Sequence, residues 1–380
     1  MELSYRICGQ GIVDQNAAVS KIKNLTEGLH AFELKVTDND GLSSKDTMTV
    51  TVLPPRPVIN LQLIPIGTLY PERKFIATAS SGDKIFFAGG SSQDGTQFFS
   101  AVNIYNYNTG DWSTAELSEP RIDIGAITTG NKVLFAGGTG NEVSPWDYDI
   151  DFSTRMDLYD VNTNTWSATE LPISFNYVSG YYGFHAAVDN IAFFYSLFSV
   201  NAYTYNITTG QWSSSAMNLE MSGAAAASVE NKILIAMGST PSGYSKSVVF
   251  YNTTANSWSL NSSLSEARGH SKAATLGSKI FFAGGVSSEG FFSGKVDMYD
   301  NATNSWSSGF LSRPAMLNGA AVAGQKILFF EGSRVDIYDN SSGEWAVAEL
   351  NQIFSEASSF ITAGDNIYVL NGNTVWRVQL

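Results

Sequence analysis

Hydrophobic and polar residues alternate in short stretches along most of the chain, and segments rich in glycine, asparagine, serine and threonine separate these stretches. The alternation has the two-residue period of a β-strand with one buried face. The separating segments have the composition of turns. The pattern therefore predicts an all-β protein built from many short strands.

One unit of this pattern occurs six times. The heptapeptide KIFFAGG stands at 84–90 and again at 279–285, and in both places a Tyr-Asn or Tyr-Asp pair and then a tryptophan follow. Related segments lie between and after these two copies. Their closing tryptophans are Trp112, Trp166, Trp212, Trp258, Trp306 and Trp345. A period of about fifty residues with several strands per unit indicates one four-stranded sheet per repeat, stacked radially as in a propeller.

The repeated letters have physical roles in such a fold. The glycine doublet lets the backbone turn tightly and approach the next sheet. The tyrosine and tryptophan are expected to fill the wedge between adjacent sheets. The innermost strands, such as 223–228 and 319–324, consist almost entirely of small residues because strands converge on the axis.

The two ends of this repeat region complement each other. Residues 358–380 supply three strands of a further unit, and 59–73 align with the outer strand and exit of an earlier unit at 111–121. We therefore expect seven blades, with the N-terminal strand completing the last one and removing bare sheet edges. Six blades is the alternative, if the weakest unit at 191–212 is misassigned.

The first 53 residues form a different domain. Their pattern predicts strands near 18–22, 31–37 and 46–52, with a turn at 38–41. A β-sandwich of this kind needs about seven strands, so this one is expected to be partial, with an open edge that can pair with another chain. The stretch LPPRP is a short stiff linker, and the predicted domains are 1–53 and 54–380.

These motifs resemble two known families. The glycine doublet, the Tyr-Asp or Tyr-Asn pair and the tryptophan resemble the kelch repeat over 54–380, and VTDNDGLSS at 36–44 resembles a PKD-type Ig-like domain. The resemblance implies a seven-bladed kelch-type β-propeller behind the C-terminal half of a PKD-type sandwich. It also implies an extracellular or cell-surface location.

Charge and cysteine content limit the partners and cofactors. The formal net charge is −13, so neither nucleic acid nor an anionic membrane surface is an expected partner. No apolar run is long enough to span a bilayer, and membrane insertion is not expected. The single cysteine, Cys8, lies outside the propeller, which excludes the copper chemistry of galactose oxidase-like kelch enzymes. We expect no metal and no cofactor, with calcium as an alternative considered below.

Aromatic residues gather in the predicted long loops. In propellers of this type, the loops between the second and third strands share one face with the connections between blades, and exposed aromatic side chains there form a stacking platform for sugars or a protein contact. The alternative is that these loops fold down and bury their own rings. The candidate residues are Phe98, Phe99, Trp146, Tyr148, Tyr181, Tyr182, Phe291 and Phe292.

Three carboxylates alternate with apolar residues in one of these loops. Asp147, Asp149 and Asp151 fall on one side of a strand of period two. They are kept as ligand-binding candidates. A calcium site would need a loop that wraps the ion, so a solvated acidic hairpin face is preferred to calcium binding.

Arginines recur just before the predicted inner strands. If Arg73, Arg121 and Arg268 rim the central channel, they can clamp a carboxylate. A structural ion pair repeated in several blades is the preferred alternative. The three histidines, His30, His185 and His270, lie in separate units, and this separation favours structural roles over metal ligation.

These observations predict a non-catalytic binding or adhesion module of a secreted or cell-surface protein, which recognises a glycan or a protein through one propeller face. The alternative is an enzyme that acts on acidic sugars or glycans, mutarotase-like or glycan-degrading, through arginines and carboxylates at the channel rim. Propellers support both kinds of function, so the fold alone does not choose between them.

Overall fold

The computed structural model describes residues 2–4, 11–12, 22–23, 25–52, 54–140, 152–172, 183–196, 201–217, 221–355 and 357–380. Backbone packing divides the chain into two compact units, Met1–Pro57 and Val58–Leu380. The division follows the proline-rich segment that the sequence predicts as a linker. The described residues contain no helix that is long and apolar enough to cross a membrane.

The first unit contains a three-stranded antiparallel sheet and a separate strand pair. The sheet consists of β1 (Glu2–Ser4), β4 (Gly28–Thr37) and β5 (Ser43–Val52), and the pair consists of β2 (Gly11–Ile12) and β3 (Ile22–Lys23). Two of the three predicted strands correspond to β4 and β5. The third, near 18–22, falls largely outside the described residues.

The turn between β4 and β5 forms where the sequence predicts it. The carboxylate of Asp38 accepts hydrogen bonds from the backbone N–H groups of Asp40 and Leu42, at 3.0 and 2.9 Å. Asparagine and aspartate favour turns because of such local bonds. His30 is buried, and its Nε2 lies 2.7 Å from the carbonyl oxygen of Thr26, so this histidine has a structural contact.

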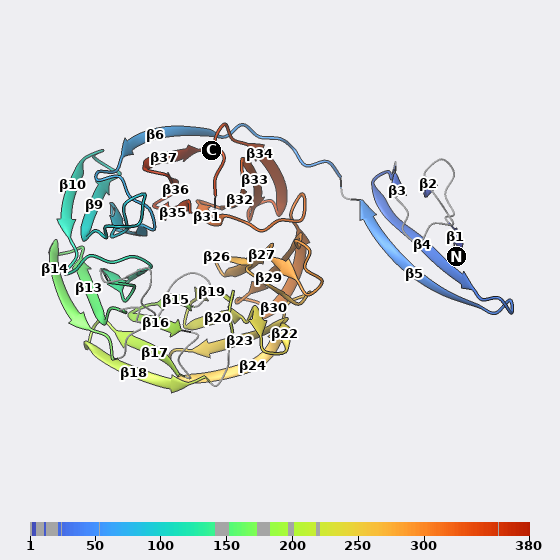
Figure 1. Ribbon diagram of the computed structural model, residues 1–380, viewed down its shortest axis with the longest axis horizontal. Helices are drawn as coiled ribbons and strands as arrows, with labels where there is room; N and C mark the ends of the chain where they lie inside the picture. Colours follow the sequence, from blue (N-terminus) through green and yellow to red (C-terminus); the bar gives the residue numbers. More distant parts are fainter. Residues whose placement is uncertain are drawn as a thin grey trace. The chain divides into compact units, whose positions relative to one another are not determined.

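Seven four-stranded antiparallel sheets make up the described part of the second unit, and they form a ring (Figure 1). In every blade the strands are named from the inner to the outer one. Blade 1 contains β7 (Ala77–Ser81), β8 (Lys84–Ala88), β9 (Ala101–Asn106) and β10 (Trp112–Glu116). Blade 2 contains β11 (Gly125–Thr129), β12 (Lys132–Ala136), β13 (Arg155–Asp160) and β14 (Thr165–Glu170). Blade 3 contains β15 (Gly183–Val188), β16 (Ile191–Ser196), β17 (Asn201–Asn206) and β18 (Gln211–Ala216).

The remaining blades follow in chain order. Blade 4 contains β19 (Ala225–Val229), β20 (Lys232–Ala236), β23 (Ser247–Asn252) and β24 (Ser257–Ser263). Blade 5 contains β26 (Lys272–Leu276), β27 (Lys279–Ala283), β29 (Lys295–Asp300) and β30 (Ser305–Phe310). Blade 6 contains β31 (Gly319–Ala323), β32 (Lys326–Glu331), β33 (Arg334–Asp339) and β34 (Glu344–Glu349). Blade 7 contains β35 (Ser359–Ala363), β36 (Asn366–Asn371), β37 (Thr374–Gln379) and the N-terminal strand β6 (Gln62–Thr68).

The ring is closed by the two ends of the propeller. Strand β6 pairs antiparallel with β37, from Gln62 opposite Gln379 to Thr68 opposite Thr374. Just before it, the N–H of Ile59 donates a 2.8 Å hydrogen bond to the carbonyl of Val347 in blade 6. The predicted closure and the count of seven blades are therefore confirmed, and the alternative of six is wrong.

The innermost strands form a continuous circle. Each of β7, β11, β15, β19, β26, β31 and β35 contacts the next, and β35 contacts β7. Short polar side chains join neighbouring strands: Thr128 Oγ1 donates to the carbonyl of Ser80, and Thr275 Oγ1 to that of Ser228, both at 2.7 Å. Small residues at these positions allow the strands to approach the axis, as the sequence predicts.

The wedges between blades are filled by seven hydrophobic clusters, each drawn from two adjacent blades. In blades 1 to 6 a third-strand tyrosine lies directly opposite the outer-strand tryptophan, with ring centroids 4.6–5.4 Å apart. Trp166, for example, contacts Phe135 of its own blade and also Phe86 of the preceding blade. The expected wedge role is confirmed, with Trp112 the more exposed case at 37%.

The glycine doublet of blade 1 shows why these positions lack side chains. Gly89 and Gly90 have φ of 67° and 107°. A Cβ atom on Gly89 would lie 2.6 Å from the carbonyl oxygen of Arg121 in blade 2, and one on Gly90 would lie 2.6 Å from that of Lys74. The N–H of Gly90 donates to the same Arg121 carbonyl at 2.9 Å. The doublet therefore brings adjacent blades together, as expected.

We predict that Trp166→Ala lowers the free energy of unfolding by about 3–5 kcal/mol, because it empties a wedge between blades 1 and 2. Trp112→Ala serves as the matched comparison and should cost less, since more of that ring is already exposed. Urea denaturation of both variants measures the difference. Equal losses, or no loss for Trp166→Ala, would contradict the wedge role.

Candidate functional site

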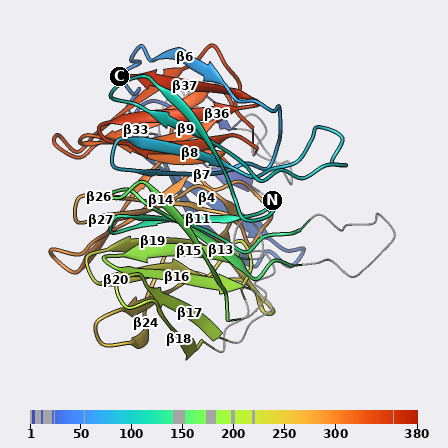
Figure 2. The same cartoon turned by 90° about the vertical axis from the view of Figure 1, so that its left-hand side faces the viewer.

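The segments that lead into the inner strands and the loops between second and third strands lie at the same end of the blades. Three isolated bridges join them: Lys74 to Ser91, Ile122 to Thr139, and Ser222 to Ser239. In blade 5 the same contact forms the short strands β25 (Arg268–Gly269) and β28 (Val286–Ser287). We call this end the loop face. The expected sharing of one face is confirmed, and Figure 2 shows the connections emerging at the two ends of the strands.

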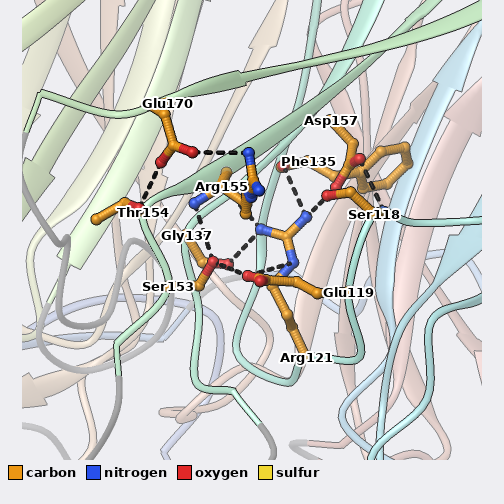
Figure 3. Close-up of polar contacts among 10 residues, drawn as sticks. All are labelled: Ser118, Glu119, Arg121, Phe135, Gly137, Ser153, Thr154, Arg155, Asp157 and Glu170. Carbon is orange, nitrogen blue, oxygen red and sulfur yellow. Dashed lines mark hydrogen bonds and ion pairs between the residues drawn. The ribbon is translucent and has the colours of Figure 1, made fainter.

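Arg121 lies inside blade 2, beneath the loop face (Figure 3). Its side chain is 0% exposed and forms an ion pair with the buried Asp157 of the third strand. One terminal nitrogen donates to the carbonyls of Gly137 and Arg155, both at 2.8 Å. The other terminal nitrogen also donates to the Phe135 carbonyl at 3.4 Å. The guanidinium group thus satisfies several carbonyls around the end of the second strand.

Arg268 has the same arrangement in blade 5. Its Nε donates to the carbonyl of Gly284, the first residue of the doublet, and a terminal nitrogen donates to that of Phe282, both at 3.0 Å. The same terminal nitrogen lies 2.7 Å from Asp297 Oδ2. The ion pair between the buried arginine and the third-strand aspartate therefore occurs in two blades.

Arg73 of blade 1 follows this pattern with an amide in place of the carboxylate. It donates to the carbonyls of Gly89 and Phe87, and to Asn103 Oδ1 at 2.8 Å. Because Asn103 carries no charge, burial lowers the pKa of Arg73 to about 10, and Glu116 offsets this only in part. Burial also lowers the pKa of Arg121, against the opposing effect of Asp157.

The third-strand aspartates also hold the connections between blades. Asp157 accepts a hydrogen bond from the backbone N–H of Ser118 at 2.9 Å, and Asp297 accepts one from that of Ser265 at 3.0 Å. Next to the arginine of blade 2, the hydroxyl of Ser153 donates to Glu119. These bonds fix the lead-in segment against the blade.

The three arginines are therefore internal, with exposed fractions of 0–1%. Arg73, Arg121 and Arg268 do not form a rim that could clamp a carboxylate, and their geometry is that of the structural alternative. Blade 4 shows that the position can also be apolar, since Met221 and Val249 occupy the places of the arginine and the aspartate, and both are buried in one cluster.

We predict that Arg121→Met destabilises the protein by about 3–5 kcal/mol, because it leaves the buried carboxylate of Asp157 without its cation. The double variant Arg121→Met/Asp157→Val reproduces the pair found in blade 4 and should recover a substantial part of the loss. Thermal and urea unfolding of the two variants measure this coupling. A double variant as unstable as the single one would contradict the ion-pair account.

Two of the predicted aromatic residues are prominent on the loop face. Phe291 and Phe292 are 69% and 56% exposed. Their loop is an ordered hairpin, in which the N–H of Ser287 donates to the Phe291 carbonyl and that of Gly290 to the Ser287 carbonyl, both at 2.9 Å. The rings are therefore presented by a fixed backbone.

The other described aromatic candidates are less accessible. Phe98 and Phe99 are half-buried in the equivalent loop of blade 1. The remaining candidates, Trp146, Asp147, Tyr148, Asp149, Asp151, Tyr181 and Tyr182, lie outside the described residues, so their roles stay predictions. Within the described ranges, no group of three or more His, Cys, Asp or Glu residues is arranged to hold a metal ion.

An aromatic residue also recurs at a fixed spacing that is not among the predicted features. Phe98, Phe152, Tyr244 and Phe292 each stand seven residues before the third-strand tyrosine of their blade, namely Tyr105, Tyr159, Tyr251 and Tyr299. In the structure each bridges, or pairs with, the loop residue that follows the glycine of its blade. This spacing is a signal from which the repeated aromatic position could have been found. A further exposed ring, Phe75 at 52%, has no such signal.

The fold and the site define a protein with a PKD-like domain followed by a seven-bladed β-propeller. A family model described as a PKD domain matches residues 7–52. Among solved structures, one described as "Structure of YjhT" is 15% identical, with a TM-score of 0.50, and the match covers 80% of this chain and 99% of that chain. At this identity the likeness supports the fold alone. A search of curated proteins found no match.

Proposed function

We propose that this protein is a non-catalytic binding or adhesion module, which recognises a glycan or another protein through the loop face of its propeller. The carrying observation is the exposed pair Phe291 and Phe292 on an ordered hairpin. Aromatic rings fixed in this way offer apolar contact area at little cost in conformational entropy. Such exposed patches mark interaction sites on otherwise polar surfaces.

The proposal includes a kelch-type origin of the repeats and an extracellular or cell-surface location. The repeated glycine doublet, tyrosine and tryptophan support the first. The PKD-like domain supports the second. The net charge of −13 supports a partner other than nucleic acid.

The enzymatic alternative required arginines at the rim of the channel. Arg73, Arg121 and Arg268 are internal and bonded to backbone carbonyls and to Asn103, Asp157 or Asp297. No other observation among the described residues favours this alternative, so we do not propose it.

The test is a screen of the intact chain against a printed glycan array and, in parallel, a pull-down from extracellular and surface protein extracts. A ligand whose capture depends on the loop face is the expected result. Absence of any ligand in both screens would overturn the proposal.

We predict that Phe291→Ala/Phe292→Ala weakens capture of that ligand at least about tenfold, because truncation of two central aromatic anchors removes more than about 1.4 kcal/mol of binding free energy. Unfolding should be little changed, since both rings are exposed. Leu260→Ala, at a 56% exposed position on the outer strand β24, is the matched control and should bind normally. Surface plasmon resonance measures both. Equal binding by the three proteins would refute the role of the pair.

A further inference from the structure

Three residues with side chains occupy one left-handed backbone position on the loop face. Phe75, Asp123 and His270 have φ of 57°, 53° and 58°. Each stands two residues after the buried arginine of its blade and two residues before the inner strand. In blade 4 the same position is Gly223, with φ of 57°. The conformation is thus a shared feature of these lead-in segments.

Glycine is the residue that this conformation favours, because an L-residue places its Cβ close to the following carbonyl oxygen. Blade 4 makes the turn with Gly223, so the fold does not require a side chain there. Backbone strain that the fold does not need is found preferentially at ligand sites. The side chains in the other three blades therefore call for a role beyond folding.

The three positions surround the propeller axis at the loop-face end of the inner strands. Phe75 and Asp123 precede β7 and β11, which are neighbours in the inner circle. His270 precedes β26 of blade 5, and Figure 1 shows the inner strands grouped around the centre of the ring. A ligand lying across the axis can reach all three blades.

The side chains at these positions are chemically distinct. Phe75 is 52% exposed, and Lys74 Nζ lies 5.3 Å from its ring centroid. Asp123 is half-buried, and burial raises the pKa of its carboxyl. An apolar ring and a partly desolvated carboxyl group therefore stand at equivalent places in neighbouring blades.

The third side chain lies at the junction of blades 4 and 5. His270 is half-buried there, and its ring covers Gly223, where a Cβ atom would be 2.8 Å from His270 Cε1. Next to it, Tyr244 covers Gly269 in the same way, with a Cβ atom 2.6 Å from Tyr244 Cε1. Two rings therefore lie against the backbone at this junction.

We propose that Phe75, Asp123 and His270 are ligand contacts that select an uncharged saccharide. This inference rests on the proposed function and names its ligand class. The C–H face of a pyranose stacks on an aromatic ring such as Phe75, and its hydroxyls donate to the Asp123 carboxylate and exchange hydrogen bonds with His270. An anionic sugar would meet a half-buried carboxylate, while the nearby arginines are internal and offer it no compensation.

The test uses the intact chain on an array that carries neutral oligosaccharides beside sialylated and uronic-acid-containing ones. We expect at least one neutral glycan to bind, and titration of that glycan to show about tenfold or greater loss of affinity in Asp123→Asn. Asparagine tolerates the left-handed conformation, so this variant keeps the backbone and removes only the charge. Phe75→Gly should also lose affinity, with a midpoint of thermal unfolding equal to or above that of the parent.

Three results would overturn the inference. They are preference for acidic glycans with improved binding in Asp123→Asn, unchanged neutral-glycan affinity in both variants, and no glycan binding by the parent. The Phe291→Ala/Phe292→Ala variant separates this failure from failure of the proposed function. A protein or acidic-glycan ligand that is lost only in that variant would leave the proposed function standing.

Discussion

The propeller depends on the filling of wedge-shaped gaps between twisted sheets. Four-stranded sheets placed radially touch closely near the axis and diverge toward the rim, so the outer part of every interface needs large side chains. The tryptophan of the outer strand and the tyrosine opposite it supply this volume in blades 1 to 6. Near the axis the opposite constraint applies, and glycine and alanine allow close approach.

The buried arginines transfer this order from the blades to the loop face. A guanidinium group placed among strand-end carbonyls is stable only because several acceptors surround it and, in two blades, an aspartate neutralises it. The same aspartates hold the backbone of the segments between blades. A ligand that meets the loop face therefore meets segments whose backbone is already fixed, which lowers the entropic cost of binding.

The left-handed positions show how a repeated fold acquires individual chemistry. Each non-glycine residue there costs roughly 1–2 kcal/mol, a small amount for a molecule with seven filled interfaces. The backbone position is common to several blades, but Phe75, Asp123, Gly223 and His270 differ completely in chemistry. Function can therefore diverge at this position while the packing units stay nearly constant.

The sequence by itself determined the architecture, because the packing rules act locally and repeat. Alternation predicted the strands, and the six tryptophans marked the units. The unmatched ends at 59–73 and 358–380 predicted the closing strand. These features are legible since each repeat must satisfy the same wedge and the same close approach.

The tertiary structure alone decided the surroundings of individual side chains. An arginine before a strand fits the rim or the interior equally well, and the outcome depended on partners distant in sequence, such as Asp157 for Arg121. Phe98 and Phe292 share one spacing, yet only Phe292 is well exposed. Exposure is set by the neighbouring loops and blades, and left-handed backbone by the path between them, so neither can be read from local residue patterns.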